Sequence, residues 1–180
     1  MIIDTDIKEV KLIEPRVFGD DRGTFNEVFS VRALEQNGIE FKPVQENCAF
    51  SAKKGTVRGI HFQNYPHAQA KLVRCTKGRV MDYAIDLRKE SPTYLKYVCV
   101  ELTDKNKKQL FIPKGFAHAV INIEDNSEIE YLVDDFYEPS CDRSISPYDE
   151  TLNIDWGFEQ LILSDKDKNA PSVKESDCNF

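Results

Sequence analysis

Long hydrophobic runs are missing from this sequence. No stretch approaches the roughly 20 apolar residues that a membrane-spanning helix needs. The first residues, Met1–Asp6, carry neither a basic region nor an apolar core, so we expect no cleavable export signal. Paired cysteines are missing as well, because the 5 cysteines are odd in number and show no CxxC spacing. Reduced thiols fit this pattern better than a disulfide framework or a zinc site, and they favour a cytoplasmic protein.

The chain is also short of positive charge. It has 24 lysines and arginines against 31 acidic residues, and its net charge is -7. Nucleic-acid-binding proteins usually carry a basic face, so we expect no nucleic-acid partner, and an anionic ligand would need a local cluster of cations. The length of 180 residues and the 41% hydrophobic content fit one domain over residues 1–180. Its end, 171–180, is expected to be a mobile polar tail.

Short strand patterns separated by turn residues fill most of the chain. They combine β-branched and aromatic residues with Gly, Pro, Asp or Asn at most breaks, which predicts an all-β sandwich or barrel. The predicted strands are Lys8–Ile13, Thr24–Phe29, Val44–Ser51, Val57–Gln63, Lys71–Thr76, Arg79–Leu87, Tyr97–Leu102, Lys108–Ile112, Ala117–Ile123 and Glu128–Val133. One helix is predicted at Val31–Asn37, between Ser30 as N-cap and Gly38 as stop, and one helical turn before Leu161.

Histidine is scarce, with 3 residues in the chain, and one of them lies in a strand pattern. Alternation along residues 57–63 puts His61 and Gln63 on one face of the strand and Arg58 one pleat away. Histidine is the commonest general base near neutral pH, and Lys71 follows along the chain, so we expect a base and a cation to line one cavity. The alternative is a core histidine satisfied by a backbone carbonyl.

A second histidine belongs to the segment PKGFAHAVIN at 113–122, which has the spacing PxGxxHxxxN. Pro and Gly shape a turn that delivers His118 to the start of the next strand. This spacing resembles the second motif of the cupin superfamily, whose fold is a double-stranded β-helix, or jelly roll. The first cupin motif normally carries HxH and a following Glu as metal ligands, but here Gln63 stands at the second histidine and no matching Glu follows. A site built from His61, His67 and His118 is the alternative, and we expect no metal.

Motifs spread over nearly the whole chain resemble those of the dTDP-4-dehydrorhamnose 3,5-epimerases. They are Asp21-Arg22-Gly23, Gln45-Glu-Asn47, Arg58-Gly-Ile-His61-Phe-Gln63, Pro66-His-Ala-Gln-Ala-Lys71-Leu-Val, Asp86-Leu-Arg88, Pro113-Lys-Gly-Phe-Ala-His118, Glu130-Tyr131 and Leu163-Ser-Asp-Lys-Asp167. The family epimerises 4-keto-6-deoxy hexoses attached to a nucleoside diphosphate, on the route to dTDP-L-rhamnose and related sugars. The resemblance therefore implies a cupin jelly roll with short peripheral helices, a nucleoside-diphosphate sugar as substrate, and no metal or redox cofactor.

The resemblance assigns the chemistry to four residues. Epimerisation beside a ketone needs a base to remove a proton at C3 or C5, a group that holds the enolate, and an acid on the opposite face. By resemblance His61 is the base and Asp167 is its orienting carboxylate. Tyr131 is the acid, and Lys71 lies beside the enolate oxygen. The alternatives are a strand-surface salt bridge between Lys71 and Asp82, a core aromatic for Tyr131, and a solvated charge run for Asp167.

The resemblance also implies binding residues. Arg58 and His118 match positions near the sugar and the diphosphate. Arg22 matches an arginine that reaches into the neighbouring subunit's site, so we expect a homodimer; the alternative for Arg22 is an ordinary turn residue. Positions around the nucleotide are matched by Phe25, Glu27, Gln45 and Asn47, and a further aromatic of the pocket is matched by Tyr137.

The sequence thus predicts epimerisation of a nucleoside-diphosphate 4-keto-6-deoxy sugar at C3, C5 or both, above all dTDP-4-dehydro-6-deoxy-D-glucose to dTDP-4-dehydro-L-rhamnose. Where many family members have YKTTDYY, residues 131–137 read YLVDDFY, which leaves substrate detail open. Two alternatives come from other classes of protein. One is a metal-dependent cupin oxygenase or isomerase, and the other is a cupin-like module that binds sugar nucleotides without turnover.

Overall fold

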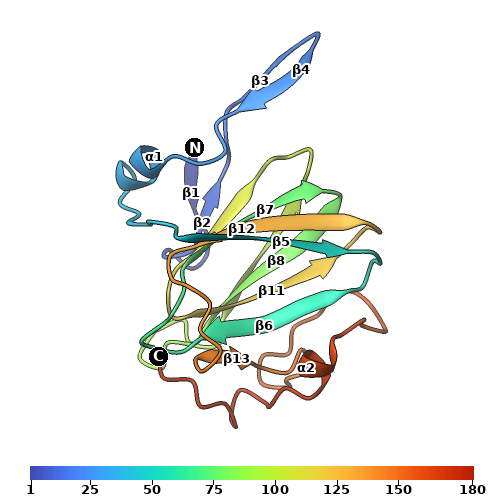
Figure 1. The fold of residues 1–180 in the computed structure, drawn as a ribbon. Coiled ribbons are helices and arrows are strands. Elements are labelled where there is room, and N and C mark those ends of the chain that lie inside the picture. The colour runs from blue at the N-terminus through green and yellow to red at the C-terminus, as the bar shows by residue number, and fades with distance from the viewer.

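Two antiparallel sheets face each other in the computed structural model, which describes residues 1–180 (Figure 1). The six-stranded sheet has the order β1 (Ile2–Asp4), β2 (Lys11–Ile13), β10 (Gln109–Ile112), β7 (Lys71–Lys77), β12 (Ser127–Val133) and β5 (Gln45–Ser51). The five-stranded sheet has the order β13 (Asp142–Ser144), β6 (Val57–Gln63), β11 (Phe116–Asn122), β8 (Arg79–Asp86) and β9 (Tyr97–Thr103). The predicted all-β jelly roll is confirmed.

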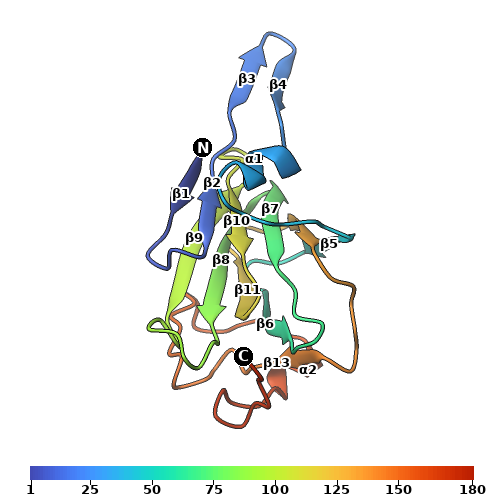
Figure 2. The same ribbon diagram turned by 90° about the vertical axis from the view of Figure 1, so that its left-hand side faces the viewer.

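A hairpin of β3 (Val17–Asp20) and β4 (Gly23–Asn26) projects from one end of the sheets (Figures 1 and 2). The two helices, α1 (Val31–Glu35) and α2 (Asp165–Lys168), are short and peripheral, as predicted. Neither helix has the length and the apolar character that a membrane span requires.

All ten predicted strands occur, and β6 has the predicted bounds. The prediction missed β1, β3 and β13, which are three of the six strands that have only three or four residues each. Ser30 caps α1 as predicted, because its hydroxyl accepts a hydrogen bond from the amide of Ala33. The helical turn expected before Leu161 is wrong: α2 follows that residue, with Ser164 as its N-cap.

The last ten residues, expected to form a mobile tail, lie against the body of the protein. Cys178 is buried in a cluster on the outer face of the five-stranded sheet. The ring of Phe180 lies 5.6 Å from that of Phe62 and 5.4 Å from that of Tyr65. The tail therefore covers β6 from outside, on the face opposite to the interior of the jelly roll.

Inward-pointing side chains from both sheets form a buried apolar cluster, which includes Val73, Cys75, Val80, Ala84, Val98, Leu102, Leu110, Phe116, Val120 and Ile129. Polar side chains also occupy inward positions of these strands, and four of them are Lys71 on β7, Asp82 on β8, His118 on β11 and Tyr131 on β12. Burying such groups is unfavourable unless they find partners, so four of them in one interior mark a functional region.

Strand β6 carries a bulge beside this polar region. Its register with β11 pairs His61 with His118 and Arg58 with Val120, so three steps along β6 match two along β11. The extra residue turns Arg58 to the face of His61, whereas simple alternation predicted it one pleat away. At Gly59 φ is +146°, and an added Cβ would lie 2.4 Å from the Cβ of Ala119. Only glycine fits this close approach.

We expect Gly59→Ala to lower the free energy of unfolding by about 3 kcal/mol or more, because a methyl group would overlap Ala119 and positive φ disfavours a side chain. Gly38→Ala is the matched control, since Gly38 has φ +75° and nothing lies within 4 Å of an added Cβ. Its free energy of unfolding should fall by only about 1–2 kcal/mol, the cost of a side chain at positive φ. Urea unfolding measures both variants, and equal losses would contradict the role of the close approach.

Candidate active site

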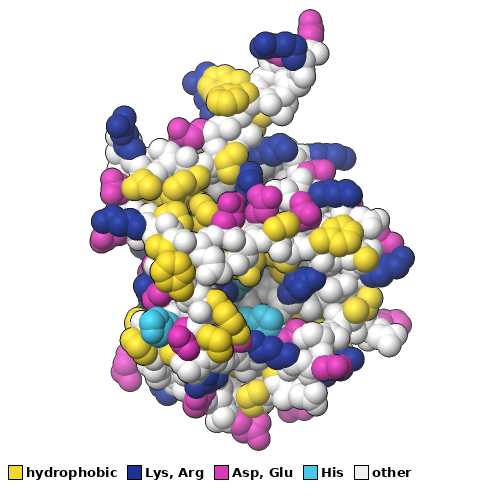
Figure 3. Space-filling model, viewed as in Figure 1, with side chains coloured by type: hydrophobic (Ala, Val, Ile, Leu, Met, Phe, Trp, Pro, Cys, Tyr) yellow, Lys and Arg dark blue, Asp and Glu magenta, His cyan; other side chains and the backbone are white.

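Three of these inward polar residues, Lys71, His118 and Tyr131, line a cavity of about 340 Å³ between the sheets. An adjoining cavity of about 390 Å³ shares His61, Lys71 and Tyr131 with it. Basic side chains and a histidine gather around a hollow on this face of the molecule (Figure 3). Nine of the twelve sequence-predicted residues line one or both cavities: Gln45, Asn47, Arg58, His61, Lys71, His118, Tyr131, Tyr137 and Asp167.

His61 and Asp167 form the shortest side-chain contact of the first cavity. Nε2 of His61 donates a hydrogen bond of 2.6 Å to Oδ1 of Asp167. Asp167 is 2% exposed, and its Oδ2 accepts a hydrogen bond from the Ser164 hydroxyl at 2.8 Å. Burial raises the pKa of Asp167, but the hydrogen bonds from His61 and Ser164 outweigh it and bring the pKa below its usual value. Asp167 is thus a buried carboxylate, and the alternative of a solvated charge run is wrong.

This contact determines which nitrogen of His61 can act. Because a carboxylate only accepts hydrogen bonds, Nε2 carries the proton and Nδ1 is the free basic nitrogen of the neutral ring. The side chain of His61 is 32% exposed, so the ring is open to the cavity on one side. The arrangement is that of an oriented general base.

Lys71 brings a cation into the interior without an ion pair. It is 8% exposed, and no carboxylate oxygen lies within 4.0 Å of its Nζ. Burial lowers the pKa of Lys71 to about 8, an effect that the more distant charges of Asp82 and Asp142 reduce. Its Nζ lies 5.8 Å from the centroid of the Tyr131 ring. The alternative of a surface salt bridge with Asp82 is wrong, because both residues are buried and they do not pair.

A second histidine and carboxylate pair lies in the same interior. Nε2 of His118 and Oδ1 of Asp82 are 2.7 Å apart, and both residues are buried. The second oxygen of this carboxylate, Oδ2, is buried without a hydrogen-bond partner. The sequence analysis named Asp82 only as a possible surface partner of Lys71. Its position between Val80 and Ala84, two residues from each, indicated an inward side chain on β8.

Tyr131 lies on the opposite sheet from His61. Burial raises the pKa of its phenol above the ordinary value, and of the nearby charges Arg58 lowers it while Asp142 raises it. The phenol is therefore protonated at neutral pH and can donate a proton as negative charge develops beside it. Because β6 and β12 belong to facing sheets, a proton acceptor and a proton donor flank one cavity from two sides.

The mouth of the adjoining cavity contains residues that sequence reasoning missed. Nζ of Lys166 donates a hydrogen bond of 2.5 Å to Oδ2 of Asp142, and the hydroxyl of Tyr137 donates one of 3.3 Å to the same oxygen. Asp142 belongs to β13, a short edge strand that alternation did not reveal. Lys166 directly precedes Asp167, so the family motif at 163–167 contained that signal.

Three predicted binding residues lie away from both cavities. Arg22 and Phe25 belong to the projecting hairpin, and Glu27 follows it. The side chain of Arg22 is 89% exposed and pairs only with Asp20, while Phe25 is 72% exposed. Within one chain, these residues do not reach the site.

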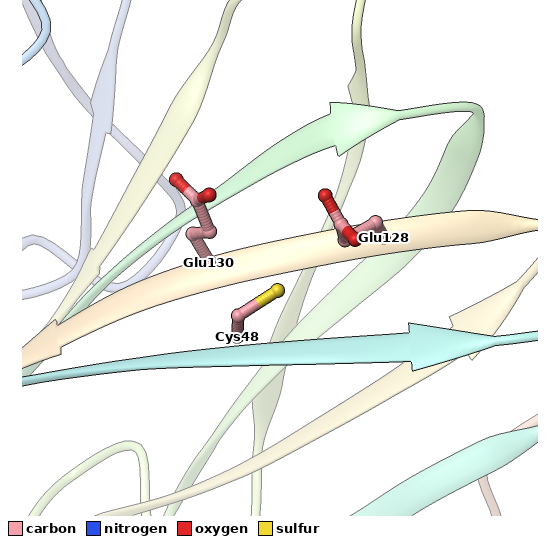
Figure 4. A group of neighbouring side chains, drawn as sticks. All are labelled: Cys48, Glu128 and Glu130. Atoms are coloured by element: carbon pink, nitrogen blue, oxygen red, sulfur yellow. The ribbon is translucent and has the colours of Figure 1, made fainter.

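The three histidines do not form a metal-ligand cluster, because no group of three possible ligand atoms within 4.8 Å of one another includes His61, His67 or His118. Gln63 uses both ends of its amide for hydrogen bonds to backbone groups, and His67 pairs with Asp135 at 3.5 Å outside the first cavity. A cluster of possible ligand atoms occurs elsewhere, at Cys48, Glu128 and Glu130 (Figure 4). These residues alternate with the inward Ala49, Ile129 and Tyr131, so they face outward, away from the cavities.

Known proteins resemble the whole chain. The sequence profile described as dTDP-4-dehydrorhamnose 3,5-epimerase matches residues 4–175. The dTDP-4-dehydrorhamnose 3,5-epimerase of Shigella flexneri is 44% identical over 177 residues, which cover 98% of this chain and 97% of that protein. The crystal structure of the dTDP-4-dehydrorhamnose 3,5-epimerase from Bacillus anthracis with TDP and PPi bound has a TM-score of 0.93 at 41% identity, over 96% of this chain and 98% of that one. The dTDP-6-deoxy-D-glucose-3,5-epimerase from Legionella pneumophila in complex with dTDP-4-keto-L-rhamnose has a TM-score of 0.93 at 41% identity, over 98% and 94%.

The depressed pKa of Lys71 predicts a pH dependence of stability. Between pH 8 and 10.5 the folded state binds fewer protons than the unfolded state, so this lysine contributes stability that rises with pH. Lys71→Met should therefore be more stable than the wild type at pH 7, by up to about 3 kcal/mol, and this advantage should shrink as the pH rises through that window. Urea unfolding of both proteins at pH 7 and 10 measures the difference. A difference that does not change with pH would mean that Lys71 titrates normally.

Proposed function

The chain belongs to the dTDP-4-dehydrorhamnose 3,5-epimerase family, and we propose that it converts dTDP-4-dehydro-6-deoxy-D-glucose to dTDP-4-dehydro-L-rhamnose by inverting C3 and C5. One observation carries this proposal: the His61–Asp167 pair on one side and Tyr131 on the other line a single cavity between facing sheets. A base and an acid on opposite sides are what inversion beside a ketone requires, because the proton leaves from one face of the sugar and returns to the other.

In the proposed reaction, Nδ1 of His61 removes the proton from C3 or C5, each of which is adjacent to the C4 ketone. The electron pair of the broken C–H bond moves into an enolate, with negative charge on the C4 oxygen. Asp167 keeps the ring in the tautomer that can accept this proton and then stabilises the imidazolium. The 2.6 Å hydrogen bond and the buried carboxylate support this role.

Lys71 is proposed to stabilise the enolate. Its ammonium group is buried in the lining of the cavity and has no ion-pair partner in the free protein. A fixed positive charge in a site of low dielectric lowers the energy of an oxyanion, typically by a few kcal/mol. The developing negative charge in turn favours the protonated form of Lys71, against the effect of its burial.

Tyr131 is proposed to return the proton from the opposite side. Its pKa lies above the ordinary value, so the phenol holds its proton until the enolate is formed. Delivery to the carbon from this side inverts the configuration. The imidazolium of His61 then releases its proton to solvent, and transfer of a proton from solvent restores the phenol. The same two groups serve C3 and C5 in turn, because both carbons flank one ketone.

The nucleotide end of the substrate is proposed to occupy the adjoining cavity, where Gln45, Asn47 and Tyr137 line the wall. Arg58 and His118 lie in the first cavity and are proposed to face the diphosphate and the sugar. The guanidinium of Arg58 is oriented by hydrogen bonds to the Ser51 hydroxyl at 3.0 Å and to the Phe50 carbonyl at 2.8 Å. These bonds use Nε and Nη2, and the N–H groups of Nη1 make no hydrogen bond to the protein and can donate to phosphate oxygens.

The proposal includes a homodimer in which the projecting hairpin completes the site of the partner. Arg22, Phe25 and Glu27 do not reach the cavities of their own chain, which supports a role in a second subunit. An apolar cleft of about 630 Å³ lies between the hairpin, β1 and α1, and its lining includes Phe18 and Phe25. Exposed aromatic residues beside an open apolar cleft are typical of a protein interface.

We also propose one catalytic domain over residues 1–180. We further propose a cytoplasmic location, which the 5 free cysteines support.

Two other functions make different predictions. A metal-dependent cupin oxygenase or isomerase would hold near-stoichiometric iron, manganese or nickel, which elemental analysis of the purified protein detects. A module that binds the sugar nucleotide without turnover has no need of a base and an acid flanking one cavity. The placement of His61 and Tyr131 therefore favours an enzyme.

Proton NMR in deuterated water tests the proposed function. With dTDP-4-dehydro-6-deoxy-D-glucose, the wild type should replace the protons at C3 and C5 by deuterium and accumulate the L-rhamno product. His61→Asn should lose this exchange by a factor of about 10³ or more while it still binds dTDP, because proton removal precedes every product. Failure of the wild type to exchange either position contradicts the proposed function. Near wild-type exchange in His61→Asn contradicts the assignment of the base.

Mixed dimers test whether the hairpin is shared. Arg22→Ala and His61→Ala should each be nearly inactive alone, and mixing them under conditions of subunit exchange should restore activity. If Arg22 acts in the partner, one site of the hybrid contains both native residues; if it acts in its own chain, neither site does. Mixing wild type with His61→Ala shows whether an inactive partner subunit lowers the activity of an intact site, and the masses of the mixed dimers show that subunits have exchanged. Inactive hybrids after demonstrated exchange would contradict the shared site.

A further inference from the structure

Gln63 stands where metal-binding cupins carry a second histidine, and the proposed reaction gives it no role. It is 4% exposed, and every polar group of its side chain is used. Nε2 donates hydrogen bonds to the carbonyl of His67 at 2.7 Å and to the carbonyl of Phe136 at 3.1 Å. Oε1 accepts a hydrogen bond from the amide of Glu138 at 2.8 Å. One side chain therefore joins the end of β6 to two separate loops.

Two of these three bonds bracket Tyr137. The carbonyl of Phe136 lies on one side of that residue along the chain, and the amide of Glu138 lies on the other. The amide of Tyr137 itself donates a hydrogen bond of 3.3 Å to Oε1 of Gln45. The ring of Tyr137 is otherwise weakly held, because the residue is 56% exposed and its hydroxyl makes one hydrogen bond, to Asp142. The position of this ring in the cavity wall thus depends on how its backbone is held.

We propose that Gln63 is a positioning residue, which holds the backbone of residues 136–138 so that Tyr137 forms the wall of the nucleotide end of the substrate pocket. The inference rests on the proposed function, since it assumes that the cavity lined by Tyr137 receives the nucleotide. At the position where metal-binding cupins carry a second histidine, this chain thus has a glutamine that supports substrate binding through a neighbouring residue.

The chemistry of an amide explains why glutamine stands here. The two carbonyls need donors and the backbone amide needs an acceptor, and a primary amide supplies both from one terminal group. A carboxylate of the same shape keeps the acceptor but loses both donors, and it faces two carbonyl oxygens. A thioether of similar length removes all three bonds. Segment 136–138 should then move, while His61 and Asp167 keep their own contacts.

The tests are Gln63→Glu and, as a second variant, Gln63→Met. We expect the KM for the 4-keto sugar nucleotide and the Kd for dTDP to rise roughly tenfold, the size of about one lost hydrogen bond, while kcat changes by less than about threefold. Calorimetric titration with dTDP measures binding without any turnover. An inactive wild type that binds dTDP would contradict the proposed function, whereas an active wild type with unchanged KM and Kd in the variants would contradict this inference. A fall of kcat alone would also overturn it.

Asn64→Asp is the matched control. Asn64 is 5% exposed, and its amide donates to the carbonyl of Asp177 at 3.0 Å and accepts from the amide of Asn179 at 3.1 Å. The same change of amide to acid therefore occurs at the next residue, but the segment held is the C-terminal tail. This variant should lose stability without a change in KM. An equal rise of KM in both variants would mean that Gln63 acts only through the fold.

A double-mutant cycle tests the route through Tyr137. If Gln63 acts by placing that ring, Gln63→Glu should raise the Kd for dTDP much less in the Tyr137→Leu background than in the wild type. Additive effects of the two substitutions on Kd would contradict the route.

Discussion

The hydrogen bond between His61 and Asp167 is the interaction on which the candidate site depends. It joins a strand near the middle of the chain to a one-turn helix near its end. Backbone bonds between Val57 and Ile162 and between Ile162 and Gly55 run this late segment alongside β6. Ser164 then starts the helix and supplies a hydrogen bond to the carboxylate that orients His61. The general base is therefore oriented by the C-terminal third of the chain as well as by the jelly roll.

The interior of the jelly roll is electrostatically incomplete without an anion. Lys71 is buried, and no carboxylate lies close enough to its ammonium group to form an ion pair. The protein as a whole has a net charge of -7, yet Arg58, Lys71 and Lys166 line the two cavities. A ligand that carries a diphosphate and develops an enolate supplies the negative charge that these cations lack. The buried lysine thus lowers the stability of the free protein, and binding of the proposed substrate would relieve this cost.

Sequence patterns predicted all seven strands of seven or eight residues and three of the six shorter ones. They failed at β1, β3 and β13, which are short strands that form by pairing with a neighbouring strand. They also misplaced Arg58, since a bulge cannot be seen in a sequence that alternates on both sides of it. The strand pattern predicted that His61 and Lys71 line one cavity, and the resemblance added Tyr131 and Asp167. The structure brings all four to one cavity. Asp142 was missed because its contribution comes from three-dimensional proximity to Lys166 alone.

In the proposed reaction, protons leave and return through different residues on opposite sides of one cavity. Tyr131→Phe tests it most directly, since the substitution removes one hydroxyl and leaves His61, Asp167 and Lys71 in place. In deuterated water, proton NMR of one sample gives both the rate of exchange and the rate of inversion of the sugar. We expect deuterium exchange into the sugar to continue, while inversion of the sugar becomes slower by a factor of about 10² or more. Inversion at the same rate as exchange would contradict the proposed role of Tyr131, because another group would then donate the proton from the side opposite to His61.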